Sequence, residues 1–396
     1  MNKDLNYLCI FGGGAVRGYA YIGVQRAFEE LGIVPKMYAG SSVGAILSAF
    51  LAAGATGQDL YDIFSEVNYE LFRDINLSFS PTFSISKGGV LLDWLRNNLE
   101  KIFYKENYIK DENSPICFKD LEKDLLIITT DIKNSKPFIF SKFHTPDFEV
   151  AEAIRISGSM PGLLTPVEHE EKLLTDGDLL KSNPLWKLDK SLCPENLRIL
   201  EFRLEGGKYN KISSVFGFFN TLYNTITNCS TDFVMGLYAK QDKFDYIKID
   251  TEDILLVNFN LSTPEKQKLI DIGYTTTMEF FNKTLPAKRT LIYEDYKALI
   301  TLTGQLKDFL SGNKLTQTKN TLGEIFMLLN SQDLKIDIEI YQQLTDFKNL
   351  FLKSRAKGFF GNDILKDKDK LRQKLLILKK ELDTKHKEFE KYFHLQ

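Results

Sequence analysis

The sequence contains few cysteines, and they are widely spaced. The four, Cys9, Cys117, Cys193 and Cys229, form no C-x-x-C pair among the 396 residues. Structural zinc sites and disulfide-rich scaffolds both need closely spaced groups of cysteines. We therefore expect neither, and we expect the protein to work in a reducing compartment.

Long apolar runs and a strong net charge are also missing. No stretch approaches the roughly 18 apolar residues of a membrane span, and the N-terminus does not contain the apolar core of a signal peptide. The formal net charge of −2 argues against nucleic-acid binding through a broad basic surface. We expect a cytoplasmic protein, peripheral to membranes, although export by a route without a cleavable signal would also fit.

The rest of the composition is that of a globular protein. Hydrophobic residues make up 43% of the chain and charged residues 26%, so a core can be built. A chain of this length suggests two to three structural units.

The central feature is the G-x-S-x-G stretch Gly40-Ser41-Ser42-Val43-Gly44. Residues 34–39 can form a short strand before it, and the apolar residues 45–53 after it predict a buried helix. Strand, sharp turn and helix are the context of a nucleophile elbow, in which Ser42 is the nucleophile and the helix N-terminus favours negative charge. The alternative is a glycine-bounded turn with a capping serine.

A second glycine-rich stretch, residues 12–18 (GGGAVRG), follows a strand predicted over residues 7–11. It leads into a helix predicted over residues 19–31. A dinucleotide fingerprint requires glycine at its sixth position, which Arg17 occupies, so that interpretation fails. The amides of such a loop suit the oxyanion of an acyl-transfer intermediate. Arg17 would shape the loop or meet a phosphate; alternatively, it is a solvated arginine in the first helical turn.

A third candidate, Asp176, ends a short apolar run and is followed by Gly177. By itself, Asp-Gly is one of the commonest turn signals. Further strands are predicted over residues 125–130 and 137–140, and a helix is predicted over residues 149–156.

The histidines offer no suitable base for Ser42. The four are His144, His169, His386 and His394. The first two precede Asp176 in polar connections, and the last two lie in a charged segment near the C-terminus. The α/β-hydrolase order places the histidine after the acid, which disfavours a triad here. A Ser42–Asp176 dyad remains, in which Asp176 accepts the serine proton directly.

The ordered set of motifs resembles the patatin-like lipid acyl hydrolases. Residues 11–23 resemble the first strand, oxyanion loop and helix of that family, and residues 153–162 resemble the block before its catalytic aspartate. The resemblance is good from about residue 5 to residue 190. It implies an α/β three-layer patatin-like domain with a mostly parallel central sheet over residues 1–285, followed by an α-helical C-terminal region over residues 286–396.

The resemblance also implies the chemistry. Ser42 attacks a fatty acyl ester, Asp176 takes its proton, and water releases the fatty acid from an acyl-serine. No metal and no other cofactor is required, and the substrate is a phospholipid or another acyl lipid at a membrane surface. The oxyanion hole is assigned to Gly13, Gly14, Ala15, Arg17 and Gly18, and the elbow glycines are Gly40 and Gly44.

Two positions differ from the family pattern. The third glycine of the oxyanion loop falls on Ala15, which still offers an amide. The aspartate motif usually continues Asp-Gly-Gly or Asp-Gly-Ala, whereas Asp178 stands at the third position here. A second carboxylate close to Asp176 would raise the pKa of that residue.

The C-terminal region is expected to be helical. Helices are predicted over residues 293–310 and 321–330, with a break at residues 311–313. A long amphipathic helix is predicted from apolar residues at three- and four-residue steps, which are Leu371, Leu375, Leu378, Leu382 and Phe389. This region would pack on the catalytic domain or form a helical hairpin, form a homodimer, or dock on a membrane. Residues 353–360 pair basic side chains with two phenylalanines, which suits anionic head groups or a solvated loop.

The sequence thus favours a phospholipase A-type lipid acyl hydrolase. Two alternatives remain at this point. The first is a triggered toxin or defence effector lipase that is idle until an activator binds. The second is a catalytically silent lipid-binding module that keeps the fold.

Overall fold

The computed structural model describes most of the chain, and every structural statement below concerns the described residues. They are residues 6–67, 75–78, 84–110, 112–180, 197–206, 221, 225, 244–254, 259–312, 314–330, 336–357 and 363–393. Within them, residues up to Phe280 form one compact unit, and residues from Phe281 onward form another.

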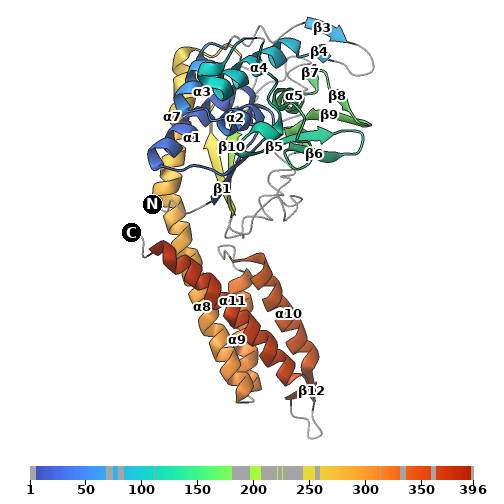
Figure 1. The fold of residues 1–396 in the computed structure, drawn as a ribbon. Helices are drawn as coiled ribbons and strands as arrows, with labels where there is room; N and C mark the ends of the chain where they lie inside the picture. The colour runs from blue at the N-terminus through green and yellow to red at the C-terminus, as the bar shows by residue number, and fades with distance from the viewer. Residues whose placement is uncertain are drawn as a thin grey trace. The chain divides into compact units, whose positions relative to one another are not determined.

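The first unit is built on an eight-stranded mixed sheet (Figure 1). Its order is β11-β10-β1-β2-β5-β9-β8. The remaining strand, β6, pairs with the edge of β5 opposite to the one that β2 and β9 occupy. From β11 to β5 the neighbouring strands run parallel, whereas β6, β8 and β9 are antiparallel to their partners. The strands are β1 (Asn6–Phe11), β2 (Met37–Gly40), β5 (Asp124–Asp131), β6 (Lys136–Ser141), β8 (Val167–His169), β9 (Lys172–Asp176), β10 (Leu197–Glu205) and β11 (Phe244–Asp250).

Side chains on both faces of the central strands are buried. In β1, Leu8 and Ile10 join a cluster on one face, while Phe11 stacks on Phe202 of β10 on the other. Parallel strands covered on both faces read as nearly continuous apolar runs, which is why residues 7–11 signalled a strand. The register aligns Phe11 with Gly40 and with Phe202, so the loops after β1 and β2 leave the same edge of the sheet.

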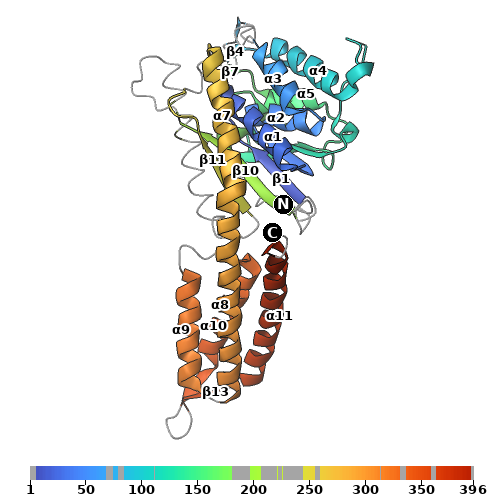
Figure 2. The same ribbon diagram turned by 90° about the vertical axis from the view of Figure 1, so that its left-hand side faces the viewer.

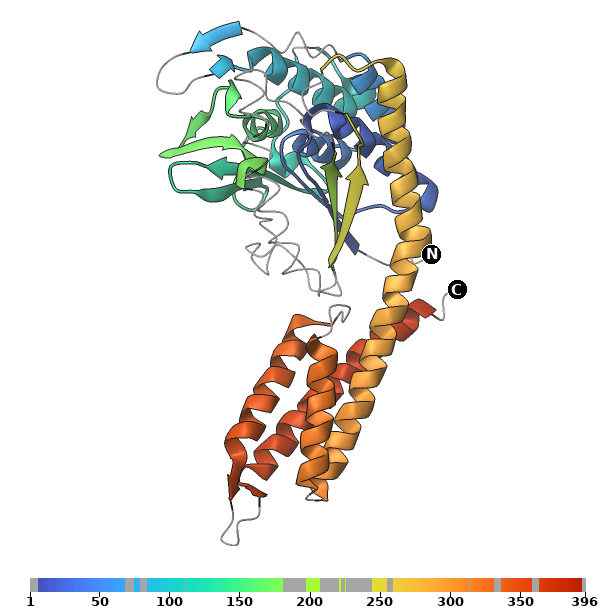
Figure 3. The ribbon, with the colours of Figure 1, turned by 180° about the vertical axis from the view of Figure 1, so that it is seen from behind.

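Two helices that are far apart in sequence touch backbone to backbone. They are α1 (Tyr19–Leu31) and α7 (Thr263–Glu279), which lie side by side in Figures 1 and 3. A Cβ on Gly23 would lie 1.9 Å from the carbonyl oxygen of Ile270, and a Cβ on Gly273 would lie 1.9 Å from that of Ala20. Glycine at both positions therefore sets the distance between the helices.

A smaller group of elements stands near the start of α2 (Val43–Ala52). It comprises α3 (Gly57–Ser65), α4 (Gly89–Tyr104) and a three-stranded sheet of β3 (Ile75–Ser78), β4 (Ser84–Ser86) and β7 (Gly162–Leu164). The short strands β3 and β4 were not predicted from the sequence, because three or four residues carry little periodicity.

The second unit is a bundle of four helices (Figure 2). They are α8 (Leu285–Ser311), α9 (Leu315–Asn330), α10 (Ile338–Ser354) and α11 (Lys368–Phe393). The leucines predicted to form an apolar stripe, Leu371, Leu375, Leu378 and Leu382, are at most 1% exposed in the core of this bundle. The side chain of Phe389 lies outside the described set.

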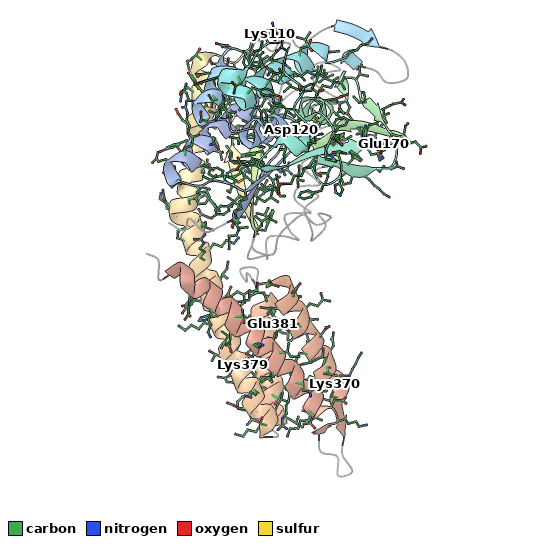
Figure 4. The ribbon with its side chains drawn as sticks, viewed as in Figure 1. Lys110, Asp120, Glu170, Lys370, Lys379 and Glu381 are labelled. Atoms are coloured by element: carbon green, nitrogen blue, oxygen red, sulfur yellow. The ribbon has the colours of Figure 1, made fainter. Side chains whose placement is uncertain are left out.

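Charged residues lie along α11, where Figure 4 labels Lys370, Lys379 and Glu381. Large apolar side chains of the bundle are exposed as well, among them Met327, Leu376 and Ile377. Asp337 caps the N-terminus of α10, and its amide donates to the hydroxyl of the buried Tyr296 at 3.0 Å. The strands β12 (Arg355–Lys357) and β13 (Asp363–Leu365) join α10 to α11. The basic residues of the predicted pairing, Lys353, Arg355 and Lys357, lie at the end of α10 and in β12, whereas Phe359 and Phe360 fall outside the described residues.

The expected fold class is confirmed: a mostly parallel sheet with helices around it, followed by a helical C-terminal region. The two compact units divide at Phe280, within a π-helical turn (Phe280–Thr284), a few residues before the predicted boundary. None of the helices described is both long enough and apolar enough to cross a membrane.

The α1–α7 contact can be tested by comparing a glycine-to-alanine substitution in the contact with the same substitution outside it. Gly273→Ala forces the two backbones apart and should destabilise the first unit by about 2 kcal/mol or more. Gly304→Ala in α8 is the matched control, because a Cβ there meets no atom within 4 Å. That variant should be as stable as the wild type or slightly more stable. Thermal unfolding followed by circular dichroism measures both, and equal midpoints for the two variants would contradict the contact.

Candidate active site

Ser42 lies in a sharp turn between β2 and α2 and is partly exposed. Its backbone has φ 53° and ψ −127°, a combination that normally requires glycine. A residue other than glycine in such a conformation costs of the order of 1–3 kcal/mol, and this strain is common at functional sites. A sharp, strained turn from strand to helix is the backbone setting in which a nucleophile elbow holds its serine.

The elbow glycines are required by close packing. A Cβ on Gly40 would lie 2.2 Å from the carbonyl oxygen of Gly44, and a Cβ on Gly44 would lie 2.0 Å from that of Phe11. Gly18 plays a similar part, since a Cβ there would lie 2.4 Å from a methyl group of Val43. The three glycines let the turn sit directly on the end of β1.

Ser157 holds the backbone of Ser42 in place. It is the last residue of α5 (Val150–Ser157) and is fully buried. Its hydroxyl accepts from the amide of Ser42 at 3.0 Å and donates to the carbonyl oxygen of Ile128 in β5 at 2.6 Å. Sequence reasoning placed Ser157 within a family block but gave it no role.

Asp176 is fully buried at the end of β9, opposite Thr129 of β5. Its amide donates to the carbonyl oxygen of Ser159 at 3.1 Å, and its Oδ1 accepts from the amide of Asp178 at 2.8 Å. The next residue, Gly177, packs against the elbow, since a Cβ there would lie 3.1 Å from the Cβ of Ser41. The turn after Asp176 thus adjoins the residue before Ser42.

The glycine loop approaches Ser42 from the end of β1. A Cβ on Gly13 would lie 3.1 Å from the Cβ of Ser42. The amide of Gly13 donates to Oδ1 of Asp178 at 3.2 Å, so this amide already has an acceptor. Ala15 has φ 46°, which explains why the family pattern has glycine there.

Arg17 is 5% exposed, so the solvated alternative is wrong. Its Nη1 donates to the carbonyl oxygen of Gly206, after β10, at 2.9 Å. Arg17 therefore ties the glycine loop to the end of β10, which agrees with a role in shaping the loop.

Asp178 has a charged partner that the sequence did not reveal. Its Oδ1 lies 3.0 Å from Nη1 of Arg203 in β10, and the Nε of Arg203 donates to Glu201 at 2.5 Å. Burial by itself would lower the pKa of Arg203, but the charges of Glu201 and Asp178 outweigh it and raise that pKa above its ordinary value. The negative charge of Asp178 next to Asp176 is thus compensated.

An apolar cavity of about 140 Å³ opens at Ser42. Its wall combines α2, α3, α4, β4 and β7, and Trp94 packs on Phe50 and Phe64 with ring centroids 6.0 Å apart. The lining residues are Ala15, Ser42, Val43, Ile46, Phe64, Val67, Ser86, Leu91, Trp94, Gly158, Met160, Leu163, Leu164 and Phe259. Such a cavity suits an aliphatic chain.

The described histidines contact residues outside the candidate site. His169 packs among Phe138, Phe140 and Phe148, and His144 lies beside Ser141. His386 stacks on Tyr293 in the second unit, and His394 is outside the described residues. In the described part of the chain, no group of three or more His, Cys, Asp or Glu side chains could hold a metal ion.

Comparison with known proteins identifies a domain in the first part of the chain. Residues 9–189 match the family model described as patatin-like phospholipase. The chain carries a patatin-like phospholipase domain. The match covers all the residues assigned to the elbow, the glycine loop and the aspartate turn, as the resemblance implied.

The chain is also similar in sequence or in structure to several known proteins. It is 27% identical over 293 residues to the uncharacterized protein YqhO of Bacillus subtilis, and the aligned region covers 69% of this chain and 97% of YqhO. It is 30% identical over 174 residues to an uncharacterized NTE family protein, Mb1092c, of Mycobacterium bovis, and the aligned region covers 44% of this chain and 43% of that protein. VipD from Legionella pneumophila shares the fold, with a TM-score of 0.51 at 14% identity over 96% of this chain and 88% of VipD.

The strain at Ser42 predicts an unusual order of stabilities. Ser42→Gly should be more stable than Ser42→Ala by about 1 kcal/mol, because glycine adopts this backbone conformation without strain. Ser48, within α2, is the matched control, and there the glycine variant should be less stable than the alanine variant by about 1 kcal/mol. Urea unfolding measures all four variants. The same order at both positions would show that Ser42 is not strained.

Proposed function

We propose that the protein is a phospholipase A-type lipid acyl hydrolase that works through a Ser42–Asp176 dyad. The observation that carries the proposal is the strained, partly exposed Ser42 at the mouth of an apolar cavity. A serine held in this way is typical of a nucleophile elbow. The family match to patatin-like phospholipases supports the same class of reaction.

In the proposed reaction, the acyl chain enters the cavity and its carbonyl carbon meets the Oγ of Ser42. Asp176 accepts the serine proton as the C–O bond forms. The amides of Gly14 and Ala15 receive the oxyanion, since that of Gly13 donates to Asp178. The N-terminus of α2 adds its positive dipole end.

The leaving alcohol then takes the proton from Asp176, and an acyl-serine remains. Water attacks this ester while Asp176 accepts a proton from it, and Asp176 then returns the proton to the Oγ of Ser42 as the Oγ–acyl bond breaks and the fatty acid leaves. Arg17 and Gly18 support the loop without contacting the oxyanion. The apolar lining of the cavity favours a fatty acyl chain over a small polar acyl group.

We further propose that the enzyme acts at a membrane surface from the aqueous side, as a peripheral cytoplasmic protein. The proposal includes two candidate partners for the enzyme. One is an activator, and the other is a second copy of the chain bound through the C-terminal helices. A requirement for an activator would appear as activity that depends on added cell lysate.

Fatty-acid release from mixed phospholipid vesicles tests the dyad. Ser42→Ala and Asp176→Asn should each lower release by at least about 10³-fold, because nucleophile and base act as one unit. Ser65→Ala and Asp147→Asn are the matched controls, since both residues are exposed and distant in sequence from these motifs. Each assay is run with and without cell lysate. Release that survives Ser42→Ala would overturn the mechanism, and silence of the wild type under all conditions would favour a lipid-binding module.

The cavity predicts a limit on acyl chain length. Leu91→Trp should fill the cavity and raise KM for long-chain esters at least about 10-fold while short-chain esters are still cleaved. Leu92→Trp on the same helix is the control, because Leu92 is not among the described residues that line the cavity. Hydrolysis of p-nitrophenyl esters of increasing length measures the effect. An equal change for every chain length would place the acyl group elsewhere.

A further inference from the structure

One buried carboxylate joins the three motifs of the candidate site. Asp178 is 3% exposed, and its Oδ1 accepts from the amide of Gly13 at 3.2 Å and from the hydroxyl of Ser41 at 2.6 Å. The same oxygen lies 3.0 Å from Nη1 of Arg203. Gly13 belongs to the glycine loop, Ser41 precedes the nucleophile, and Asp178 itself follows the Asp176-Gly177 turn.

We propose that Asp178 is a positioning residue that fixes the glycine loop and the nucleophile elbow relative to Asp176. Arg203 and Glu201 complete this assembly, which we call the Asp178 network. The inference rests on the proposed hydrolase function, and it adds residues that the dyad does not include. Asp178 acts through its neighbours and needs no contact with the substrate.

The glycine loop fits this network closely. A Cβ on Gly13 would lie 2.7 Å from Oδ2 of Asp178, and a Cβ on Gly12 would lie 2.6 Å from Nη1 of Arg203. Glycine at both positions therefore lets the loop rest directly on the ion pair. The loop is held from one side by the network, which leaves its next two amides, those of Gly14 and Ala15, for the oxyanion.

The backbone of Asp178 also orients the proposed base. Its amide donates to Oδ1 of Asp176 at 2.8 Å, and a hydrogen bond to one carboxylate oxygen fixes the plane of that group. A shift of Asp178 would therefore move the base, the elbow and the loop together. Small displacements of this kind slow a reaction strongly, because the reacting atoms must meet within a narrow range of distances.

Arg203 supplies the charge that allows a second carboxylate at this place. A buried carboxylate without a partner would be costly, and here the guanidinium bridges Asp178 and Glu201. The family pattern has glycine or alanine after Asp-Gly, so the carboxylate at residue 178 is a feature of this chain. Its ion pair with Arg203 links the aspartate turn to β10, which pairs with β1 beneath the loop.

Asp178→Ala and Asp178→Asn test the proposal in the full-length protein. Three readouts are used: hydrogen–deuterium exchange of peptides covering residues 11–18, the rate at which a fluorophosphonate labels Ser42, and kcat and KM for a p-nitrophenyl ester. Asp178→Ala should increase exchange in the loop and lower kcat and labelling about 10–100-fold, with KM changed by less than about 3-fold. Asp178→Asn keeps an oxygen that can accept the same hydrogen bonds and should recover most of the loop protection and of kcat.

Asp245→Ala is the matched control. It removes another buried Arg–Asp pair of the same sheet, in which Arg198 of β10 lies 3.4 Å from Asp245 of β11. It should lower thermal stability while leaving loop exchange, labelling and kcat close to those of the wild type.

The outcomes separate the two proposals. Loop exchange in Asp178→Ala that equals the wild type, or a kcat loss no larger than that of Asp245→Ala, would overturn the positioning role. A wild type that neither hydrolyses esters nor reacts with the fluorophosphonate would overturn the proposed function. In that case, the exchange measurement still decides whether Asp178 holds the loop.

Discussion

The turn that carries Ser42 packs on the end of β1 through backbone atoms alone. Gly40 packs on the backbone of Gly44, and Gly44 packs on the backbone of Phe11. Neither contact leaves room for a Cβ. Because the turn is so tight, Ser42 is forced into a backbone conformation that normally requires glycine. Ser157, the glycine loop and the aspartate turn all meet at this point, so their arrangement depends on the same close contact.

The topology explains why segments more than a hundred residues apart meet here. The glycine loop and the elbow follow β1 and β2, whose ends are level in a parallel sheet. The aspartate turn arrives from β9, which runs antiparallel to β5 and ends beside it. Loops at the carboxyl ends of parallel strands are the usual place for a site in an α/β fold. Here the antiparallel strand β9 supplies the third segment of the candidate site, the aspartate turn.

Much of this site could be predicted from the sequence because its signals are local. The G-x-S-x-G turn lies between an apolar strand and an apolar helix, and the glycine loop follows another apolar strand. The supporting contacts could not be predicted in this way. The contacts of Ser157 with Ser42, of Arg203 with Asp178 and of Asp178 with Gly13 each join residues at least 25 positions apart. The sequence marked Asp178 as a departure from the family pattern but did not reveal these partners.

The same distinction holds for the fold. Strands β1 and β5 and helices α1 and α2 were predicted close to their observed ends, because buried strands and glycine-terminated helices have strong patterns. β2 starts at Met37, later than predicted, since the exposed Val34 and the following proline precede the sheet. Helix α10 was not predicted, although its apolar positions Ile340, Leu344, Phe347 and Phe351 follow the helical repeat.

The α1–α7 contact and the pairing of β10 with β1 set the size of the smallest piece of chain that can stand alone. The family match ends at residue 189, yet β10, β11 and α7 all lie beyond that point. A fragment cut at the end of the match would turn β1 into an exposed edge and uncover the apolar flank of α1. Open edges of that kind recruit other chains. The family match therefore ends before the compact unit does. Recombinant fragments of the first unit need to extend to about Phe280.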